Sequence, residues 1–138
     1  MNLSLNFKIS GIRSLLNAHI EHSNGIHVWI RSMDSENANL MIMLSFIILG
    51  HPDWRKANIS IFETCKPENL AETRKHMEEL VATGRLPITS KNIEIITEKE
   101  GVNIKSLINQ KSSDAGLVIL GIREEQIKHS GKEVFEGY

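Results

Sequence analysis

The chain has 138 residues, of which 16 are Lys or Arg and 17 are Asp or Glu, so its formal net charge at pH 7 is −1. This length is typical of one domain that buries a core without disulfides or metal ions. A hydrophobic share of 41% and a charged share of 24% exclude wholesale disorder. The balanced charge argues against a nucleic-acid partner, because proteins that bind nucleic acid carry a basic surface.

The single cysteine, Cys65, excludes an intramolecular disulfide and favours a reducing, cytoplasmic setting. The longest apolar run covers residues 40–49, which is about half of the ~20 residues that a membrane crossing needs. We therefore expect no direct insertion of this chain into a membrane. The N-terminus also lacks the charged and apolar regions of a secretory signal.

The first 24 residues carry two patterns. Apolar and polar residues alternate over 3–9, which predicts a half-buried strand or an extended arm. Over 12–22 the apolar spacing is mostly helical, and Asn24-Gly25 is a stop signal. We treat residues 1–24 as an N-terminal arm of strand and helix.

After Gly25 strands and helices alternate. Apolar segments bounded by turn residues predict strands at 26–30, 58–62, 93–96 and 117–120. Helical spacing predicts helices at about 36–50, 67–83 and 102–111, the first capped by Asp34 or Ser35. This order is typical of an α/β fold, a doubly wound, mostly parallel sheet of four to five strands with helices on both faces. We expect a single domain over 1–138, with its core at 25–122.

The end of the sheet is the least regular part of this prediction. No further strand fits after residue 121, so residues 123–138 are expected to be a C-terminal extension. The sheet would then lack a closing strand, which suggests a chain cut before a final strand or a partner that completes the edge. Ligands of such sheets bind in the loops after the strands, here 31–35, 63–66, 97–101 and 121–130.

The helix predicted at 36–50 is apolar on nearly all sides, with Ser45 as the polar exception between 40 and 49. In one interpretation it is core, packed between the sheet and the N-terminal segment. In the other, its outer face docks a second subunit or a neighbouring domain, because large exposed apolar patches mark interaction sites. The second interpretation predicts a homodimer with an interface that contains Met41, Met43, Phe46 and Ile47.

Two sets of residues resemble known families. Residues 113–121, Ser-Asp-Ala-Gly followed by an apolar strand and Gly121, are similar to a segment of universal stress proteins. A wider set, spread over about residues 25–121, resembles the C-terminal cytosolic domain of cation-chloride cotransporters. It consists of 25–31 leading into an apolar helix, His51-Pro52-Asp53-Trp54-Arg55-Lys56 with the strand after it, and 111–115, Lys-Ser-Ser-Asp-Ala.

The wider resemblance implies a universal-stress-protein-like fold on the cytoplasmic side of the plasma membrane, as part of a membrane transporter of which this domain is a soluble piece. The domain would be a non-catalytic regulatory and assembly unit. Its partners would be the membrane domain of the parent transporter and a second copy of itself. Ion sites of that family lie in the membrane part, so we expect no catalytic residue, no cofactor and no metal in this chain.

The alternative function is a universal-stress-protein-type nucleotide-binding module. Members that bind ATP place a Gly-x2-Gly-x9-Gly-Ser/Thr loop after the fourth strand, where backbone N–H groups hold phosphates. Gly121 fits the start of this loop, but Glu124 and Glu125 follow and would repel a triphosphate. Asp34 stands where adenine or ribose could be held, although a role as helix cap is favoured.

A small α/β enzyme is the third hypothesis. The six histidines are scattered through the predicted elements without a motif. His19 and His22 have a spacing that could share a metal on a helix, but no third ligand is identifiable. Cys65 precedes a predicted helix, where a thiolate would be stabilised, yet no base accompanies it. Lys132 follows Gly131 without the rest of a P-loop motif.

Overall fold

The computed structural model describes residues 5–9, 22–31, 37–83 and 87–121, together with 128, 129, 131, 133, 136 and 138. The strands are β1 (Leu5–Ile9), β2 (Ile26–Arg31), β3 (Ile59–Cys65), β4 (Ile93–Thr97) and β5 (Leu117–Gly121). The α-helices are α1 (Ala38–Leu49), α2 (Leu70–Ala82) and α3 (Ile104–Lys111). Single turns of 3-10 helix lie at η2 (His22–Asn24), η4 (Pro52–Trp54), η5 (Pro67–Asn69) and η6 (Ser90–Asn92).

The four strands and three helices predicted after Gly25 are all present, and the differences lie at their ends. β3 runs on to Cys65, because its last residues pair with β2 on one side and with β4 on the other. α1 begins at Ala38 with Asn37 in the capping position, so the prediction of Asp34 or Ser35 as the cap is wrong. Those two residues, and residues 12–21 of the N-terminal helix predicted at 12–22, lie outside the described residues.

The sheet has the order β1-β5-β2-β3-β4. β5, β2, β3 and β4 run parallel, whereas β1 is antiparallel to β5, with Leu5 opposite Gly121 and Ile9 opposite Leu117. This confirms the doubly wound, mostly parallel sheet. The expectation that the sheet lacks a closing strand is wrong at the β5 edge. The strand predicted at 3–9 returns to that edge and pairs its backbone groups there.

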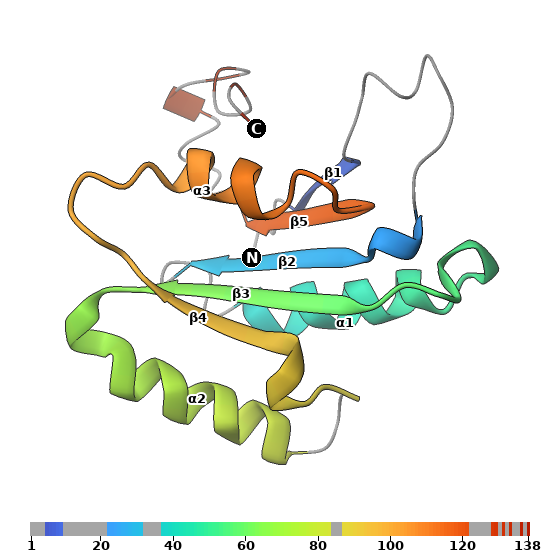
Figure 1. The fold of residues 1–138 in the computed structure, drawn as a ribbon, viewed down its shortest axis with the longest axis horizontal. Helices are drawn as coiled ribbons and strands as arrows, with labels where there is room; N and C mark the ends of the chain where they lie inside the picture. Colours follow the sequence, from blue (N-terminus) through green and yellow to red (C-terminus); the bar gives the residue numbers. More distant parts are fainter. Residues whose placement is uncertain are drawn as a thin grey trace.

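The helices cover both faces of the sheet, as predicted (Figure 1). α1 and α2 pack on one face, where Met41, Ile42 and Met77 meet the inward side chains of the strands. α3 packs on the other face, where Ile108 meets Trp29 and Val118. β5 lies between the two layers and is buried along its whole length, which explains its continuous apolar sequence.

One glycine is required at the start of β2. Gly25 has φ = 92°, and a Cβ atom placed on it would lie 2.5 Å from the backbone oxygen of Asn58. That oxygen accepts a hydrogen bond from the N–H of Ile26, so it cannot move away without breaking the first link between β2 and the turn before β3.

Among the helices that the structure describes, none has the length and apolar character to cross a lipid bilayer.

Candidate functional site

Helix α1 faces the sheet with one side and solvent with the other. Its 12 residues include no charged side chain. Ala38, Met41, Ile42 and Ser45 are buried. The hydroxyl of Ser45 donates to the carbonyl of Ile42 within the same helix, which is how a polar group is accommodated in the core.

The outer side of α1 leaves two large apolar side chains in contact with water. Met43 is 46% exposed and Ile47 is 65% exposed, and the spacing of four residues places them on one side of the helix, beside the half-buried Phe46. We call Met43, Phe46 and Ile47 the α1 surface. Met41 is fully buried and packs in the core, so its prediction as an interface residue is wrong.

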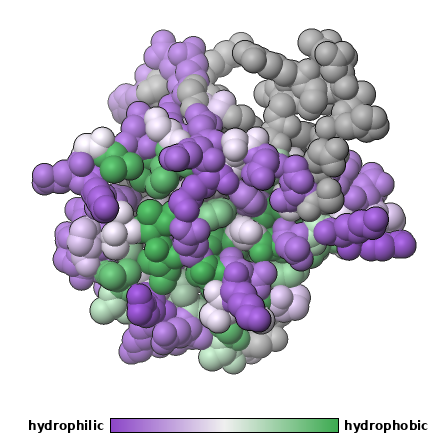
Figure 2. All heavy atoms as spheres, viewed as in Figure 1, coloured by the Kyte–Doolittle hydropathy of each residue, from purple (hydrophilic) through white to green (hydrophobic). Residues whose placement is uncertain are grey.

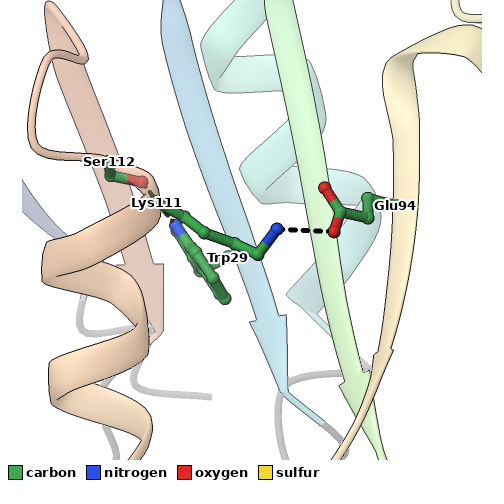
Figure 3. Close-up of polar contacts among 4 residues, drawn as sticks. All are labelled: Trp29, Glu94, Lys111 and Ser112. Carbon is green, nitrogen blue, oxygen red and sulfur yellow. Dashed lines mark hydrogen bonds and ion pairs between the residues drawn. The ribbon is translucent and has the colours of Figure 1, made fainter.

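The opposite face of the molecule is only partly covered by a helix. Figure 2 shows hydrophobic side chains in the middle of this view, bordered by hydrophilic ones. On this face Phe62 of β3 stacks on Trp29 of β2, with ring centroids 4.6 Å apart and planes 17° from parallel. The Nζ of Lys111, at the end of α3, lies 5.8 Å from the centroid of the Phe62 ring. The same Nζ pairs with Glu94 of β4 at 2.6 Å (Figure 3).

A polar cluster lies next to Lys111, at the amino-terminal end of the parallel strands. The indole Nε1 of Trp29 donates to the hydroxyl of Ser112 at 2.9 Å (Figure 3). Ser112 Oγ also lies 2.8 Å from Nδ1 of His27. Burial lowers the pKa of His27 below its usual 6.5, and the Asp114 carboxylate acts in the opposite direction. In the neutral tautomer that carries its proton on Nε2, Nδ1 accepts the hydroxyl proton of Ser112, and the serine then uses one donor and one acceptor position at once.

A serine beside a histidine is the pairing that activates a nucleophile. Ser112 is only 6% exposed, however, and its oxygen is already bound by the indole of Trp29. A substrate carbonyl has no approach to a hydroxyl in this position. We therefore assign Ser112 a structural role, as the link between α3 and β2, which sequence reasoning had missed.

The carboxyl-terminal end of the sheet is where doubly wound domains bind ligands. The strand order reverses between β2 and β5, which places the switch point between these two strands. The guanidinium of Arg31, the last residue of β2, donates to the carbonyl of Gly121, the last residue of β5. This bond spans the switch point on the α3 side. Asp34, Glu124 and Glu125, weighed above for nucleotide binding, lie outside the described residues.

Near its end, just before Cys65, β3 carries two polar side chains that lack hydrogen-bond partners within the part of the chain that the structure describes. The carboxyl of Glu63 is on a residue that is 5% exposed, and its Oε2 is unpaired. Burial raises the pKa of Glu63 to about 7. Thr64 is fully buried on the opposite face, and its hydroxyl is also unpaired. No described base or nucleophile is bonded to either group.

The other sequence candidates are separated in space or fall outside the described residues. The ring of His22 makes an edge contact with Trp54, at 4.6 Å between centroids, and His19 is not among the described residues. Over the described ranges, no three His, Cys, Asp or Glu side chains come together as metal ligands. Cys65 is the last residue of β3 and is 2% exposed, which argues against a reactive thiol.

Comparison with known proteins adds no family to this description. The chain matches no family model, no curated protein and no solved structure. The doubly wound α/β fold therefore rests on the sheet order and the two helical layers themselves. The resemblance to cation-chloride cotransporter domains, and to universal stress proteins, stays a prediction from the sequence motifs.

Proposed function

We propose that this chain is a non-catalytic cytosolic domain that regulates and assembles a cation-chloride cotransporter-like transporter, and that it forms homodimers through the α1 surface. The observation that carries the proposal is the exposure of Met43 and Ile47 on a helix without charged residues. Two motifs of the sequence resemblance add support, because Trp29 from one and Ser112 from the other are in direct contact.

The α1 surface is suited to a weak contact. Full burial of one large apolar side chain is worth about 1.5 to 3 kcal/mol. With Met43 46% and Ile47 65% exposed, burial of both on two copies contributes roughly 3 to 7 kcal/mol per dimer. Micromolar affinity needs about 8 kcal/mol after the loss of freedom on association has been overcome. These side chains alone therefore favour a dimer only at high local concentration.

A membrane protein supplies such a concentration. Two modules that are held near each other by a linker meet at an effective concentration of order millimolar. In the proposed assembly the membrane domains hold two cytosolic domains together, and the α1 surface then sets how they pair. A contact of this strength can also open and close in response to a regulatory signal.

Sedimentation equilibrium of the chain from about 10 μM to about 1 mM tests the dimer. A dissociation constant of 1 mM needs a net free energy of about 4 kcal/mol, so association in this range requires contacts around Met43 and Ile47 in addition to these two side chains. We expect partial dimerisation that Ile47→Glu weakens at least tenfold. Val102→Glu is the matched control, because Val102 is 47% exposed and lies outside α1. A chain that stays monomeric at 1 mM, or an equal loss with both variants, contradicts the proposed interface.

The transporter context has a separate test. Sequencing the genomic reading frame that encodes this chain should find hydrophobic segments of about 20 residues upstream in the same frame, each long enough to span a bilayer. A frame without such segments contradicts the transporter part of the proposal. The dimer measurement does not depend on this result.

The alternative, a universal-stress-protein-type nucleotide-binding module, is favoured by the switch point between β2 and β5. The Arg31 guanidinium already donates to the carbonyl of Gly121 at that point, so a phosphate there would have to share the guanidinium with this carbonyl. Calorimetric titration with ATP and with AMP separates the two functions. Micromolar binding of either nucleotide favours the alternative, and no heat of binding favours the assembly domain.

A further inference from the structure

β4 forms one edge of the sheet. It pairs with β3 along one side, and in the described ranges no strand pairs with its other side (Figure 1). Outward N–H and C=O groups of an edge strand are free to pair with another extended segment. β1 covers the edge at β5, so the two edges of this sheet differ.

A cleft of about 410 Å³ lies directly beside this free edge, between β4 and α2. Its apolar wall is formed by Met77, Val81, Ile93 and Ile95, and Arg74 and Glu78 stand at its rim. Ile93 and Ile95 are half-buried residues of β4 itself, on the side that faces α2. A segment laid along β4 would therefore point every second side chain toward this cleft.

The opposite side of β4 is acidic. Glu94 is on that side, and the period of two places Glu98, just after the strand, on the same side. The N–H of Glu98 donates to Cys65 O at 2.8 Å, which continues the pairing with β3. Glu94 is paired with Lys111. The half-buried Glu98 makes no ion pair with any described residue, so a cation on an added strand would complete it.

These charges distinguish between two occupants of the edge. A second copy of β4 has no Lys or Arg on the side that carries Glu98, and paired antiparallel about Ile96 it would bring Glu94 of one chain opposite Glu98 of the other. Like charges in directly opposed positions destabilise a strand pair. An extended peptide with a basic residue at every second position avoids this repulsion and pairs with Glu98.

We propose that β4 and the α2–β4 cleft bind an extended peptide in which apolar residues alternate with Lys or Arg, added to the sheet as a further strand. Its main chain pairs with the free edge of β4. Its apolar side chains enter the cleft against Ile93 and Ile95, and a basic side chain reaches Glu98. This is the mode in which backbone bonds supply affinity and pockets for alternate side chains supply specificity. The inference does not depend on the α1 surface or on the transporter context.

The test uses the full chain and a fluorescein-labelled heptapeptide of alternating Val and Lys, with binding followed by fluorescence anisotropy. We expect it to bind at least ten times more tightly than the same peptide with Glu in place of Lys. In an extended peptide the N–H groups of the odd residues point to one edge and those of the even residues to the other. N-methylation of one set therefore removes either the donors that face β4 or those that face away from it. One of the two methylated peptides should lose at least tenfold in affinity, and the other should bind like the parent.

Three results would overturn the proposal with the protein unaltered: no binding at about 1 mM, equal binding of the Lys and Glu peptides, or equal affinity of both methylated forms.

Variants of the protein add a second test. Ala82→Trp fills the cleft from α2 and should weaken binding at least tenfold, and Glu98→Lys should reverse the preference between the Lys and Glu peptides. Glu72→Lys makes the same charge change on an exposed turn of α2 and should leave the preference unchanged. A reversal with Glu72→Lys, or none with Glu98→Lys, also contradicts it.

Discussion

Replacing Glu63 by glutamine should remove a large part of the pH dependence of the stability of this domain. The carboxyl is 5% exposed, its Oε2 has no hydrogen-bond partner in the described structure, and burial raises its pKa from 4.5 to about 7. In the unfolded chain the same group deprotonates near 4.5. Between these two values the folded state keeps a proton that the unfolded state has lost.

The sign follows from proton linkage. Stability falls with rising pH wherever the folded state binds more protons, so the loss occurs between about pH 4.5 and pH 7. A pKa difference of one is worth about 1.36 kcal/mol, which makes the total loss about 3 kcal/mol at pH 8. Glu63→Gln keeps the size and polarity of the side chain without its charge. The variant should match the parent chain near pH 4 and exceed its stability by about 3 kcal/mol at pH 8.

Urea unfolding at a series of pH values from 4 to 8.5, followed by tryptophan fluorescence, measures this difference. Trp29 and Trp54 are both buried, so their emission reports on unfolding. Glu100→Gln, at an exposed turn, is the matched control and should stay parallel to the parent chain at every pH. If the Glu63→Gln difference is the same at pH 4 and pH 8, the carboxyl is solvated and the argument from burial fails.

Three further predictions concern local structure. Gly25→Ala should lower the free energy of unfolding by at least about 2 kcal/mol, measured by urea titration, because alanine meets both the positive φ and the Asn58 oxygen; an unchanged midpoint would show that the turn can move. Ser112→Ala should cost about 1 to 3 kcal/mol, since it leaves the buried indole N–H of Trp29 unpaired, and Trp29→Phe in the same chain should recover part of that loss. The thiol of Cys65 should react with Ellman's reagent only as fast as the chain opens, and rapid reaction of the native protein would refute its burial.

Local patterns were sufficient to predict the strands and α-helices that the structure describes after Gly25. The strand at 117–120 was predicted because its apolar run is continuous, and β5 is buried on both faces as that run requires. The end of β3 was missed because Glu63, Thr64 and Cys65 do not form an apolar run. They are strand because β4 pairs with all three and β2 pairs with Glu63 and Thr64 from the other side, which is a property of the assembled sheet.

The orientation of α1 could not be predicted, for a physical reason. A helix that is apolar on all sides carries no periodic signal for the side that faces the sheet. Met41 and Met43 are equivalent in such a sequence, yet docking against the sheet buries the first completely and leaves the second 46% exposed.

The polar cluster at Ser112 was missed for a related reason. Its partner His27 is 85 residues away in the chain, and no spacing rule relates two such positions.

The switch point between β2 and β5 bears on the choice between ligand binding and assembly. In a doubly wound sheet the loops at the switch point diverge and leave a crevice for a ligand. In this domain side chains connect β2 and β5 at both ends of the two strands. Trp29 and His27 of β2 bond to Ser112 just before β5, and Arg31 of β2 donates to the carbonyl of Gly121. A ligand in the crevice would have to share or displace the second bridge. The α1 surface and the β4 edge need no such rearrangement, which supports the proposed contacts with other chains.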